Sequence, residues 1–230
     1  MKMFYKIFLA LFLLSFSQYG FAQDSSSHSS VNVEKASLTR TELTSRSAAV
    51  KVSTDMSSGS GVLVQIGRKR VIFTSYHVVR GSHRITILSG SNTSPSEIIY
   101  FDEENDFAVL SAPGIPGNRA VRLRIKVETS SGMIGTRVHY SGFPAGHSLL
   151  TIRGTVAGFA RGCYILQSYG WLGASGSGVF DKDGRLVGIL TAIDFSNAGP
   201  APQLIESIVW IIPVSNINMS KVEAAIREKL

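Results

Sequence analysis

The sequence predicts an all-β protein of the barrel or sandwich class, because its apolar runs are short and turn residues separate them. Gly, Ser, Asn or Pro stands between most of these runs. After the N-terminal leader, apolar residues recur at helical spacing only over residues 215–230. The short runs form two series: residues 49–52, 61–66, 71–74, 84–88, 98–100, 107–110 and 121–125, then residues 136–140, 149–158, 162–167, 178–180, 186–193 and 208–212.

The two series indicate two small barrels, a first over about 47–125 and a second over about 132–213. A chain of 230 residues is long enough to bury a core of that size. Between two late runs, Asp181–Gly184 has the composition of a hairpin turn. The final segment, 215–230, begins with Ser and Asn and is predicted to be a C-terminal helix.

The first 22 residues have the pattern of a secretory signal peptide. Lys2 and Lys6 precede the apolar run 7–16, and Gly20–Ala22 supplies a small-x-small cleavage site. Because that run is too short to span a bilayer, a cleaved signal is favoured over an uncleaved membrane anchor. Residues 23–46 are rich in Ser and Thr and are predicted to be a flexible lead-in. The pattern therefore predicts an exported protein, periplasmic or secreted, with no stable membrane anchor.

Composition narrows the classes of partner. The formal net charge is +7, and it would fall to +5 without the two lysines of the signal segment. The one basic run, Arg68–Arg70, is most simply a solvated hairpin loop, so no nucleic-acid partner is expected. The single cysteine, Cys163, cannot form an intramolecular disulfide, and its strand-like context favours a buried thiol over a reactive nucleophile. No Cys/His spacing suggests a metal site, and no cofactor is predicted.

Three short motifs contain the residue types that acyl-transfer chemistry needs. Residues 173–178 place Ser175 among glycines, which let the backbone turn sharply and expose a hydroxyl beside converging N–H groups. His77 stands at the end of a predicted strand, and Asp106 precedes another apolar run. A nucleophilic serine needs such a base to take its proton and such an acid to orient the base.

The order along the chain is His77, Asp106, Ser175, which is the chymotrypsin-type order. An α/β-hydrolase would need a histidine after the serine, and none follows Ser175, so that fold is excluded. Neighbouring residues compete for two of these three roles: Ser177 for the serine, and Asp102, Glu103 and Glu104 for the acid.

The chain resembles the protease domain of HtrA/Deg-type, trypsin-like serine proteases over roughly residues 47–230. Five segments in order account for the likeness: Ser58–Val62, Thr74–Val79, Asp106–Leu110, Gly173–Gly178 and Gly188–Ile193. The resemblance implies two six-stranded antiparallel β-barrels with a short C-terminal helix and a site between the barrels. HtrA proteins usually continue into a PDZ domain, which this chain is expected to lack.

The resemblance assigns His77, Asp106 and Ser175 to a catalytic triad. Ser175 is then the nucleophile, His77 takes its proton and returns it to the leaving amine, and Asp106 holds the imidazole. The N–H groups of Gly173 and Ser175 are expected to form the oxyanion hole. Ala174 stands where pancreatic-type enzymes have an Asp that pairs with a new N-terminus, so that form of activation is not expected.

Alignment with the family also implies the substrate pocket, whose walls are Thr191, Ala192 and Ile193 on one side and Gly170, Trp171 and Leu172 on the other. The first wall is expected to pair with the substrate as an added strand. None of the wall residues is acidic, which disfavours cleavage after Arg or Lys. Leu190 stands where glutamate-specific relatives have His. A small or medium apolar residue is therefore expected before the cut.

The sequence thus predicts an exported serine endopeptidase that hydrolyses unfolded or exposed protein segments. One alternative is a protease fold that binds peptides or partners without cutting them. Another is an esterase-like acyl hydrolase, because the same triad cleaves esters. Protein or peptide substrates are the expected partners, and the oligomeric state is open.

Overall fold

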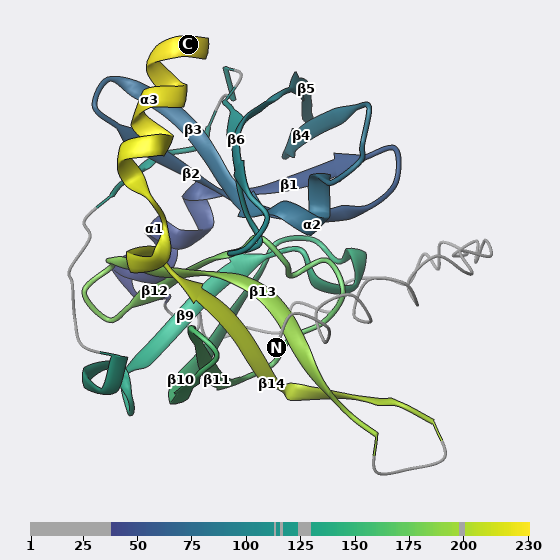
Figure 1. Ribbon diagram of the computed structural model, residues 1–230, viewed down its shortest axis with the longest axis vertical. Helices are drawn as coiled ribbons and strands as arrows, with labels where there is room; N and C mark the ends of the chain where they lie inside the picture. Colours follow the sequence, from purple (N-terminus) through teal and green to yellow (C-terminus); the bar gives the residue numbers. More distant parts are fainter. Residues whose placement is uncertain (1–37, 113, 116, 124–129, 198–200) are drawn as a thin grey trace, which may run out of the picture. The chain divides into compact units, whose positions relative to one another are not determined.

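Two β-sheets make up most of the protein, and the all-β prediction is confirmed (Figure 1). The predicted signal peptide and the first part of the predicted lead-in lie outside the described residues. This computed structural model describes residues 38–112, 114–115, 117–123, 130–197 and 201–230. The residues from Leu38 to Leu230 form one compact unit.

The N-terminal sheet has eight strands in the order β5-β4-β1-β2-β3-β7-β6, with β8 pairing in parallel with β2. Its strands are β1 Ala49–Thr54, β2 Ser58–Ile66, β3 Lys69–Ser75, β4 Ile85–Ser89, β5 Asn92–Ser96, β6 Ile98–Asp102, β7 Phe107–Ser111 and β8 Val121–Arg122. Six strands and a closed barrel were expected here. Within the described residues the outermost strands, β5 and β6, do not pair with each other, so the sheet is a half-barrel.

The C-terminal sheet is a closed six-stranded barrel in the order β10-β11-β14-β13-β12-β9, as predicted. Its strands are β9 Arg137–Gly142, β10 Leu150–Ala160, β11 Cys163–Ser168, β12 Gly178–Asp181, β13 Leu186–Ser196 and β14 Gln203–Pro213. The hairpin of β13 and β14 continues beyond the barrel, at the lower right of Figure 1. The outer half of β13 therefore pairs only with β14, which leaves one edge of that segment open.

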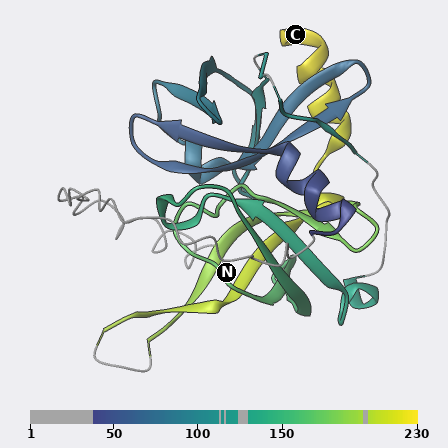
Figure 2. The same ribbon diagram turned by 180° about the vertical axis from the view of Figure 1, so that it is seen from behind.

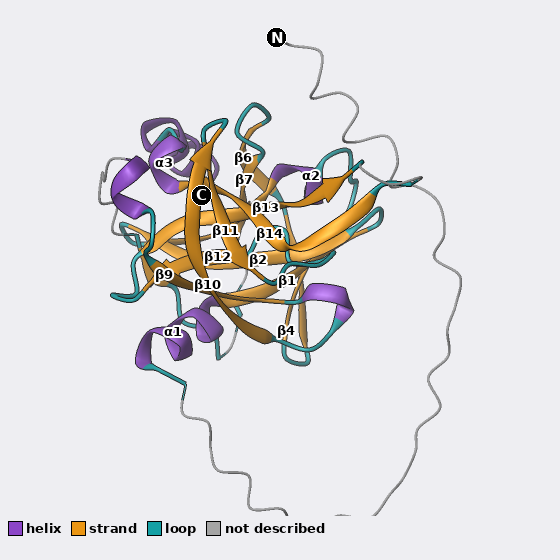
Figure 3. Ribbon diagram, turned by 90° about the horizontal axis from the view of Figure 1, so that it is seen from below, coloured by secondary structure: helices purple, strands orange, loops and turns teal. Residues whose placement is uncertain are grey.

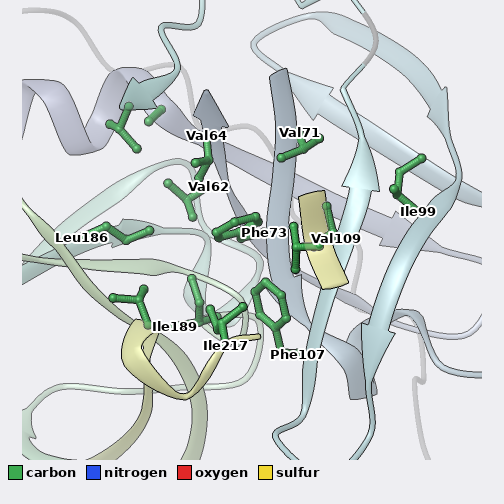
Figure 4. Packing of buried hydrophobic residues seen from close by; sticks show 14 of the residues in the cluster. Val62, Val64, Val71, Phe73, Ile99, Phe107, Val109, Leu186, Ile189 and Ile217 are labelled. Atoms are coloured by element: carbon green, nitrogen blue, oxygen red, sulfur yellow. The ribbon is translucent and has the colours of Figure 1, made fainter. Parts of the chain in front are cut away.

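Both faces of the central strands are buried, which explains their continuous apolar runs. Side chains of a strand alternate between the two faces. Val62 and Phe73 enter one core cluster, whereas Leu63 and Ile72 enter a second cluster on the other face. The first cluster also contains Ile189 of β13, so it joins the two sheets, as Figure 4 shows.

Helices lie at the edges of the molecule and strands at its centre (Figure 3). The α-helices are α1 Arg40–Ala48, α2 Tyr76–Val79 and α3 Met219–Lys229, and single 3-10 turns occur at Ser130–Met133, Pro144–Gly146 and Val214–Asn216. The predicted C-terminal helix corresponds to α3, which buries Val222 and Ile226 in the shared core. None of the helices in the described part of the chain has the length and apolarity of a membrane span.

Helix α1 corrects the prediction of a flexible lead-in at residues 40–46, whereas residues 23–37 of that segment lie outside the described residues. Thr39 and Glu42 form a capping box, in which each side chain binds the other residue's backbone N–H. Glu42 is 3% exposed and accepts two hydrogen bonds from Arg153 of β10, at 2.5 and 3.0 Å. Ser45 donates to Ser141 of β9 at 2.7 Å. These partners lie about a hundred residues away in sequence, so composition could not reveal them.

Helix α1 contacts both sheets, since it packs on β2 and β8 as well as on β9, β10 and β12 (Figure 2). The segment that precedes the first strand is therefore part of the folded unit rather than a tether to it.

Candidate active site

His77 lies on α2, the single helical turn that follows β3. Strand β3 ends at Ser75, and the N–H of Arg80 closes the turn on the carbonyl of Tyr76 at 2.9 Å. The ring of Tyr76 stacks on Phe101 of β6, with centroids 4.7 Å apart. The imidazole of His77 is 33% exposed, so one edge of it faces solvent while the turn beneath it is packed.

Asp106 holds His77 by both the ring and the backbone. Its Oδ2 lies 2.8 Å from His77 Nδ1, and its Oδ1 accepts the N–H of His77 at 2.8 Å. Its own carbonyl accepts the N–H of Tyr76 at 3.0 Å. With Nδ1 bound to a carboxylate, Nε2 is the nitrogen that can accept a proton from a nucleophile.

The three competing acids have other roles. Asp102 caps the turn before Asp106 by accepting from the backbone and side chain of Asn105. Glu103 forms an exposed ion pair with Arg80 at 3.3 Å, and Glu104 is exposed. The structure therefore brings Asp106, and not its neighbours, to His77.

Thr191 makes a contact that was not predicted from the sequence. It was expected only as a wall of the substrate pocket, but its hydroxyl also donates to Asp106 Oδ2. Thr191 lies at a register shift between β13 and β14, which turns its side chain out of the regular alternation. No local sequence signal predicts this contact, because it joins residues from the two sheets.

Ser175 lies on the loop before β12, and its hydroxyl donates to the carbonyl of Thr191 at 3.4 Å. Among the described residues no hydrogen bond joins this hydroxyl to His77. The competing Ser177 is fully buried, and its hydroxyl has no partner in the described part of the chain. A buried hydroxyl cannot reach a substrate, so the structure favours Ser175 over Ser177.

The backbone of this loop leaves two N–H groups without acceptors. Ala174 N–H donates to Trp171 O, Gly176 N–H to Leu190 O and Ser177 N–H to Ala174 O, at 2.7 to 3.0 Å. The N–H groups of Gly173 and Ser175 have no acceptor among the described residues. Two free backbone donors, one of them on Ser175 itself, are suited to an oxyanion.

Glycine is required at two positions of the loop. Gly173 and Gly176 have φ values of 92° and 91°, in the region that favours glycine. A Cβ on Gly173 would lie 2.6 Å from the carbonyl oxygen of Phe143, and one on Gly176 would collide with Ser60 O. Ala174 between them is fully buried in the barrel core, where an ionised Asp would be unfavourable.

The expected pocket walls lie on the strands and loops that the alignment implied. Thr191, Ala192 and Ile193 are half-buried on the open-edged half of β13, while Gly170 is buried and its N–H donates to Glu206 O at 2.8 Å. A Cβ on Gly170 would lie 2.7 Å from Val209 Cγ2 and 3.2 Å from Ile193 Cγ1. The Ile193 side chain therefore packs against the opposite wall, where Trp171 is half-buried and Leu172 is 40% exposed.

Cys163 is half-buried at the start of β11 rather than fully buried as expected. Burial raises the pKa of its thiol. A raised pKa disfavours the thiolate, which argues against a nucleophilic cysteine.

Curated proteases match this chain over part of their length. The chloroplastic Protease Do-like 1 of Arabidopsis thaliana is 29% identical over 175 residues, which are 70% of this chain and 37% of that protein. A serine protease of Mycobacterium tuberculosis is 24% identical over 158 residues, which are 61% of this chain and 38% of that protein. The chain thus spans less than two-fifths of the length of these relatives.

Solved structures share the fold. The inactive form of the Mycobacterium tuberculosis protease Rv3671c superposes with a TM-score of 0.63 at 17% identity, covering 80% of this chain and 92% of that chain. A serine endoprotease from Yersinia pestis superposes with a TM-score of 0.64 at 23% identity, covering 81% and 65%. An HtrA-type protease with a bound tripeptide superposes with a TM-score of 0.64 at 23% identity, covering 82% and 63%.

A family model described as a trypsin-like peptidase domain matches residues 59–189, which include His77, Asp106 and Ser175. That match covers more than half of the 230 residues. The chain therefore belongs to the trypsin-like peptidase family, and it is similar to the HtrA-type proteases within it.

Proposed function

We propose that this chain is a serine endopeptidase whose catalytic triad is His77, Asp106 and Ser175. The observation that supports the proposal most strongly is the His77–Asp106 contact at 2.8 Å. This contact leaves Nε2 of the partly exposed imidazole to act as the base. Ser175 lies on a loop in which two backbone N–H groups have no acceptor among the described residues. Membership of a peptidase family supports peptide-bond hydrolysis.

The chemistry follows from these positions. Ser175 Oγ turns from the Thr191 carbonyl, gives its proton to His77 Nε2 and forms a bond to the substrate carbonyl carbon. The carbonyl oxygen becomes an oxyanion and accepts the N–H groups of Gly173 and Ser175. The C–N bond then breaks as His77 returns the proton to the leaving amine. Water repeats the sequence to release the acid and restore Ser175.

The pocket geometry supports small apolar residues before the cut. Ile193 packs toward Gly170, so its side chain fills space between the two walls that a substrate side chain would otherwise enter. No wall position has a carboxylate to pair with Arg or Lys. The open edge of β13 would pair with the substrate backbone, which requires an extended segment such as that of an unfolded protein.

Export is the further part of this proposal. It rests on the basic residues, apolar run and small-x-small site of residues 1–22. We infer that the peptidase acts in the periplasm or outside the cell.

Fluorophosphonate labelling tests the triad without requiring the right substrate, because this probe reports an activated serine. Purified protein is expected to be labelled once, at Ser175, as read by intact mass and peptide mapping. Ser175→Ala should abolish labelling, and His77→Ala should slow it by about 10⁴-fold. Ser177→Ala is the matched control and should label at the wild-type rate, because the Ser177 hydroxyl is buried and unbonded.

The second candidate function is peptide or partner binding without cleavage. The observation that favours it is the Ser175 hydroxyl, which bonds to Thr191 instead of His77. Folded protein that resists labelling, with and without an unfolded protein substrate, would support this candidate and contradict the peptidase. Labelled protein that turns over esters but no polypeptide would indicate an acyl hydrolase instead.

A further inference from the structure

Ser60 of β2 contacts the nucleophile loop with its N–H and with its hydroxyl. Its N–H donates to the carbonyl of Ser175 at 2.8 Å, and its hydroxyl donates to the carbonyl of Gly173 at 2.7 Å. Its own carbonyl accepts the hydroxyl of Thr74 at 2.7 Å. Ser60 belongs to the N-terminal sheet and is fully buried, so it ties that sheet to a loop of the other barrel.

The Ser60 hydroxyl also holds a second loop. It accepts the N–H of Phe143 at 2.9 Å, at the entry to the turn Pro144–Gly146. In that turn Ala145 has a φ of 54°, and its N–H donates to the carbonyl of Leu172 at 2.6 Å. One hydroxyl thus joins the turn to the nucleophile loop.

The Leu172 carbonyl decides where one oxyanion donor points. It belongs to the same peptide plane as the N–H of Gly173, and the two groups of a trans peptide point in opposite directions. While Ala145 holds the carbonyl, the Gly173 N–H is directed away from that turn. If Ala145 moves, this plane is free to rotate, because Gly173 is a glycine and permits it.

The peptide planes that contain the two oxyanion donors are held by different contacts. The Ser175 N–H shares its plane with the Ala174 carbonyl, which Ser177 N–H holds at 3.0 Å within the loop. The Gly173 N–H has no such internal support, since its plane depends on the turn of residues 144–146. Of the two donors, Gly173 is therefore the one that depends on Ser60.

We propose that Ser60 is a positioning residue that keeps the Gly173 N–H directed at the oxyanion by bridging Gly173 O and Phe143 N. This inference rests on the proposed peptidase function. Removing the hydroxyl leaves a buried carbonyl and a backbone N–H without their partner, so both loops must move to find new ones. The triad residues make no hydrogen bond to this hydroxyl and are expected to keep their geometry.

The kinetic test compares Ser60→Ala with wild type. Loss of one oxyanion donor is expected to lower kcat by about 10²-fold, with KM nearly unchanged, because the donor acts on the transition state. Affinity for a peptide boronic acid, whose adduct with Ser175 Oγ resembles the tetrahedral intermediate, should fall by a similar factor. Ser177→Ala removes a buried hydroxyl from the same loop without breaking a hydrogen bond and should change neither value. Unchanged kcat and boronate affinity in Ser60→Ala would overturn the proposal.

A structural readout separates this inference from the proposed function. Amide hydrogen exchange of Ala145, an exposed residue protected by its bond to Leu172, should accelerate in Ser60→Ala. The amide of Leu190, which donates to Ser177 O at 2.9 Å, should not change. Faster exchange of the Ala145 amide in Ser60→Ala, in a protein that is never labelled at Ser175, would support the Ser60 bridge and contradict the proposed peptidase function. Unchanged exchange in an active enzyme would reject the bridge alone.

Ser60→Cys replaces Ser60→Ala as the test variant if Ser60→Ala does not fold. A thiol is of similar size but is a weaker donor. It should give a kcat between wild type and complete loss of the donor, with intermediate protection of the Ala145 amide. Wild-type kcat and wild-type protection in this variant would contradict the proposal.

Discussion

Asp106, the acid of the proposed triad, has an unfavourable backbone conformation. Its φ of 45° lies in the left-handed region, which non-glycine residues seldom adopt and which Asp tolerates better than most. Hydrogen bonds to the Asp106 carboxylate from three groups offset the cost of this conformation: the N–H and the imidazole of His77 and the hydroxyl of Thr191. The sequence placed Asp106 near His77, but the Thr191 contact required β13 to fold against the other sheet.

Asp106→Asn should preserve the fold and lower kcat by about 10⁴-fold, because an amide does not hold the imidazole in the tautomer that accepts a proton at Nε2. The measurement is kcat on a cleavable peptide beside a thermal unfolding curve. The control is Asp102→Asn, which alters the neighbouring turn but no triad contact and should retain activity near wild type. Equal losses of kcat in both variants would show that disruption of the turn, rather than loss of the His77–Asp106 contact, lowers the activity.

The two halves of strand β13 have different surroundings, which the sequence motif alone does not distinguish. Its inner half closes the barrel with β12, and its outer half, from Thr191 onward, has an open edge. Ile193 on this outer half lies against Gly170 and narrows the space between the expected pocket walls. The size of the expected pocket should therefore depend on the Ile193 side chain.

Ile193→Gly should enlarge the pocket and shift cleavage from small toward larger apolar residues before the cut. The ratio of kcat/KM for a Phe-containing peptide over the matching Ala peptide should rise by about 10-fold or more, the usual value of a changed apolar contact. Leu204→Ala, at the exposed outer part of the hairpin, is the control and should leave the ratio unchanged. A fall in both rates without a change in ratio would show that Ile193 only supports the strand.

Helix α1 depends on an ion pair whose strength varies with pH. Hydrogen bonds from Arg153 hold the pKa of Glu42 at about 2, below its ordinary value of 4.5. A carboxylate with a lowered folded pKa stabilises the fold above its unfolded pKa and stops doing so as the pH falls through the folded value. The stabilising effect of Glu42 is therefore full above about pH 4.5 and is lost toward about pH 2.

Glu42→Gln should lower the thermal unfolding midpoint at pH 7, and the difference from wild type should shrink as the pH falls from 4.5 toward 2. His139 makes both proteins sensitive to acid, because burial lowers the pKa of its imidazole, an effect that the negative charge of Glu42 partly opposes. Glu97→Gln, at an exposed position, is the matched control and should track wild type throughout. A Glu42→Gln difference that stays constant with pH would contradict the ion-pair account.

The two sheets share a core, so they are expected to unfold as one cooperative unit. The shared cluster contains Phe73 of β3 and Ile189 of β13, which are labelled in Figure 4, together with Ile226 of α3. The ring of Phe73 also packs edge-on against Phe107, with centroids 4.9 Å apart. The proposed catalytic site, with residues from both sheets, needs this coupling, because His77 and Ser175 have no common element to fix their separation.

Phe73→Ala should lower the free energy of unfolding by about 3–5 kcal/mol, as expected for a fully buried aromatic side chain. Both tryptophans, Trp171 and Trp210, lie in the C-terminal barrel, whereas Phe73 lies in the N-terminal sheet. Tryptophan fluorescence should therefore report the destabilisation across the shared core. A tryptophan transition that does not move, while circular dichroism changes, would mean that the sheets unfold independently.

Local signals account for most of what could be predicted from the sequence. Strand periodicity located the β-strands except β5, and the final helix followed from the spacing of Val222 and Ile226. Helix α1 was missed because Ser and Thr dominate its composition, although its capping box at Thr39 and Glu42 was visible in the sequence. The eight-stranded, open N-terminal sheet was missed because strand count and closure depend on which edges meet.

The motifs around His77, Asp106 and Ser175 identified three residues and their order from sequence alone, because each motif is short and its chemistry is local. The contacts that organise them are long-range: Thr191 to Asp106, Ser60 to Gly173 and Phe143, and Ile193 near Gly170. Each of these pairs is far apart in the chain, and no periodicity or composition specifies which backbone groups will face each other. The Thr191 and Ser60 contacts exist only after the two sheets pack, because burial leaves each polar group only the neighbours that packing provides, whereas the Ile193 contact requires the C-terminal barrel to close.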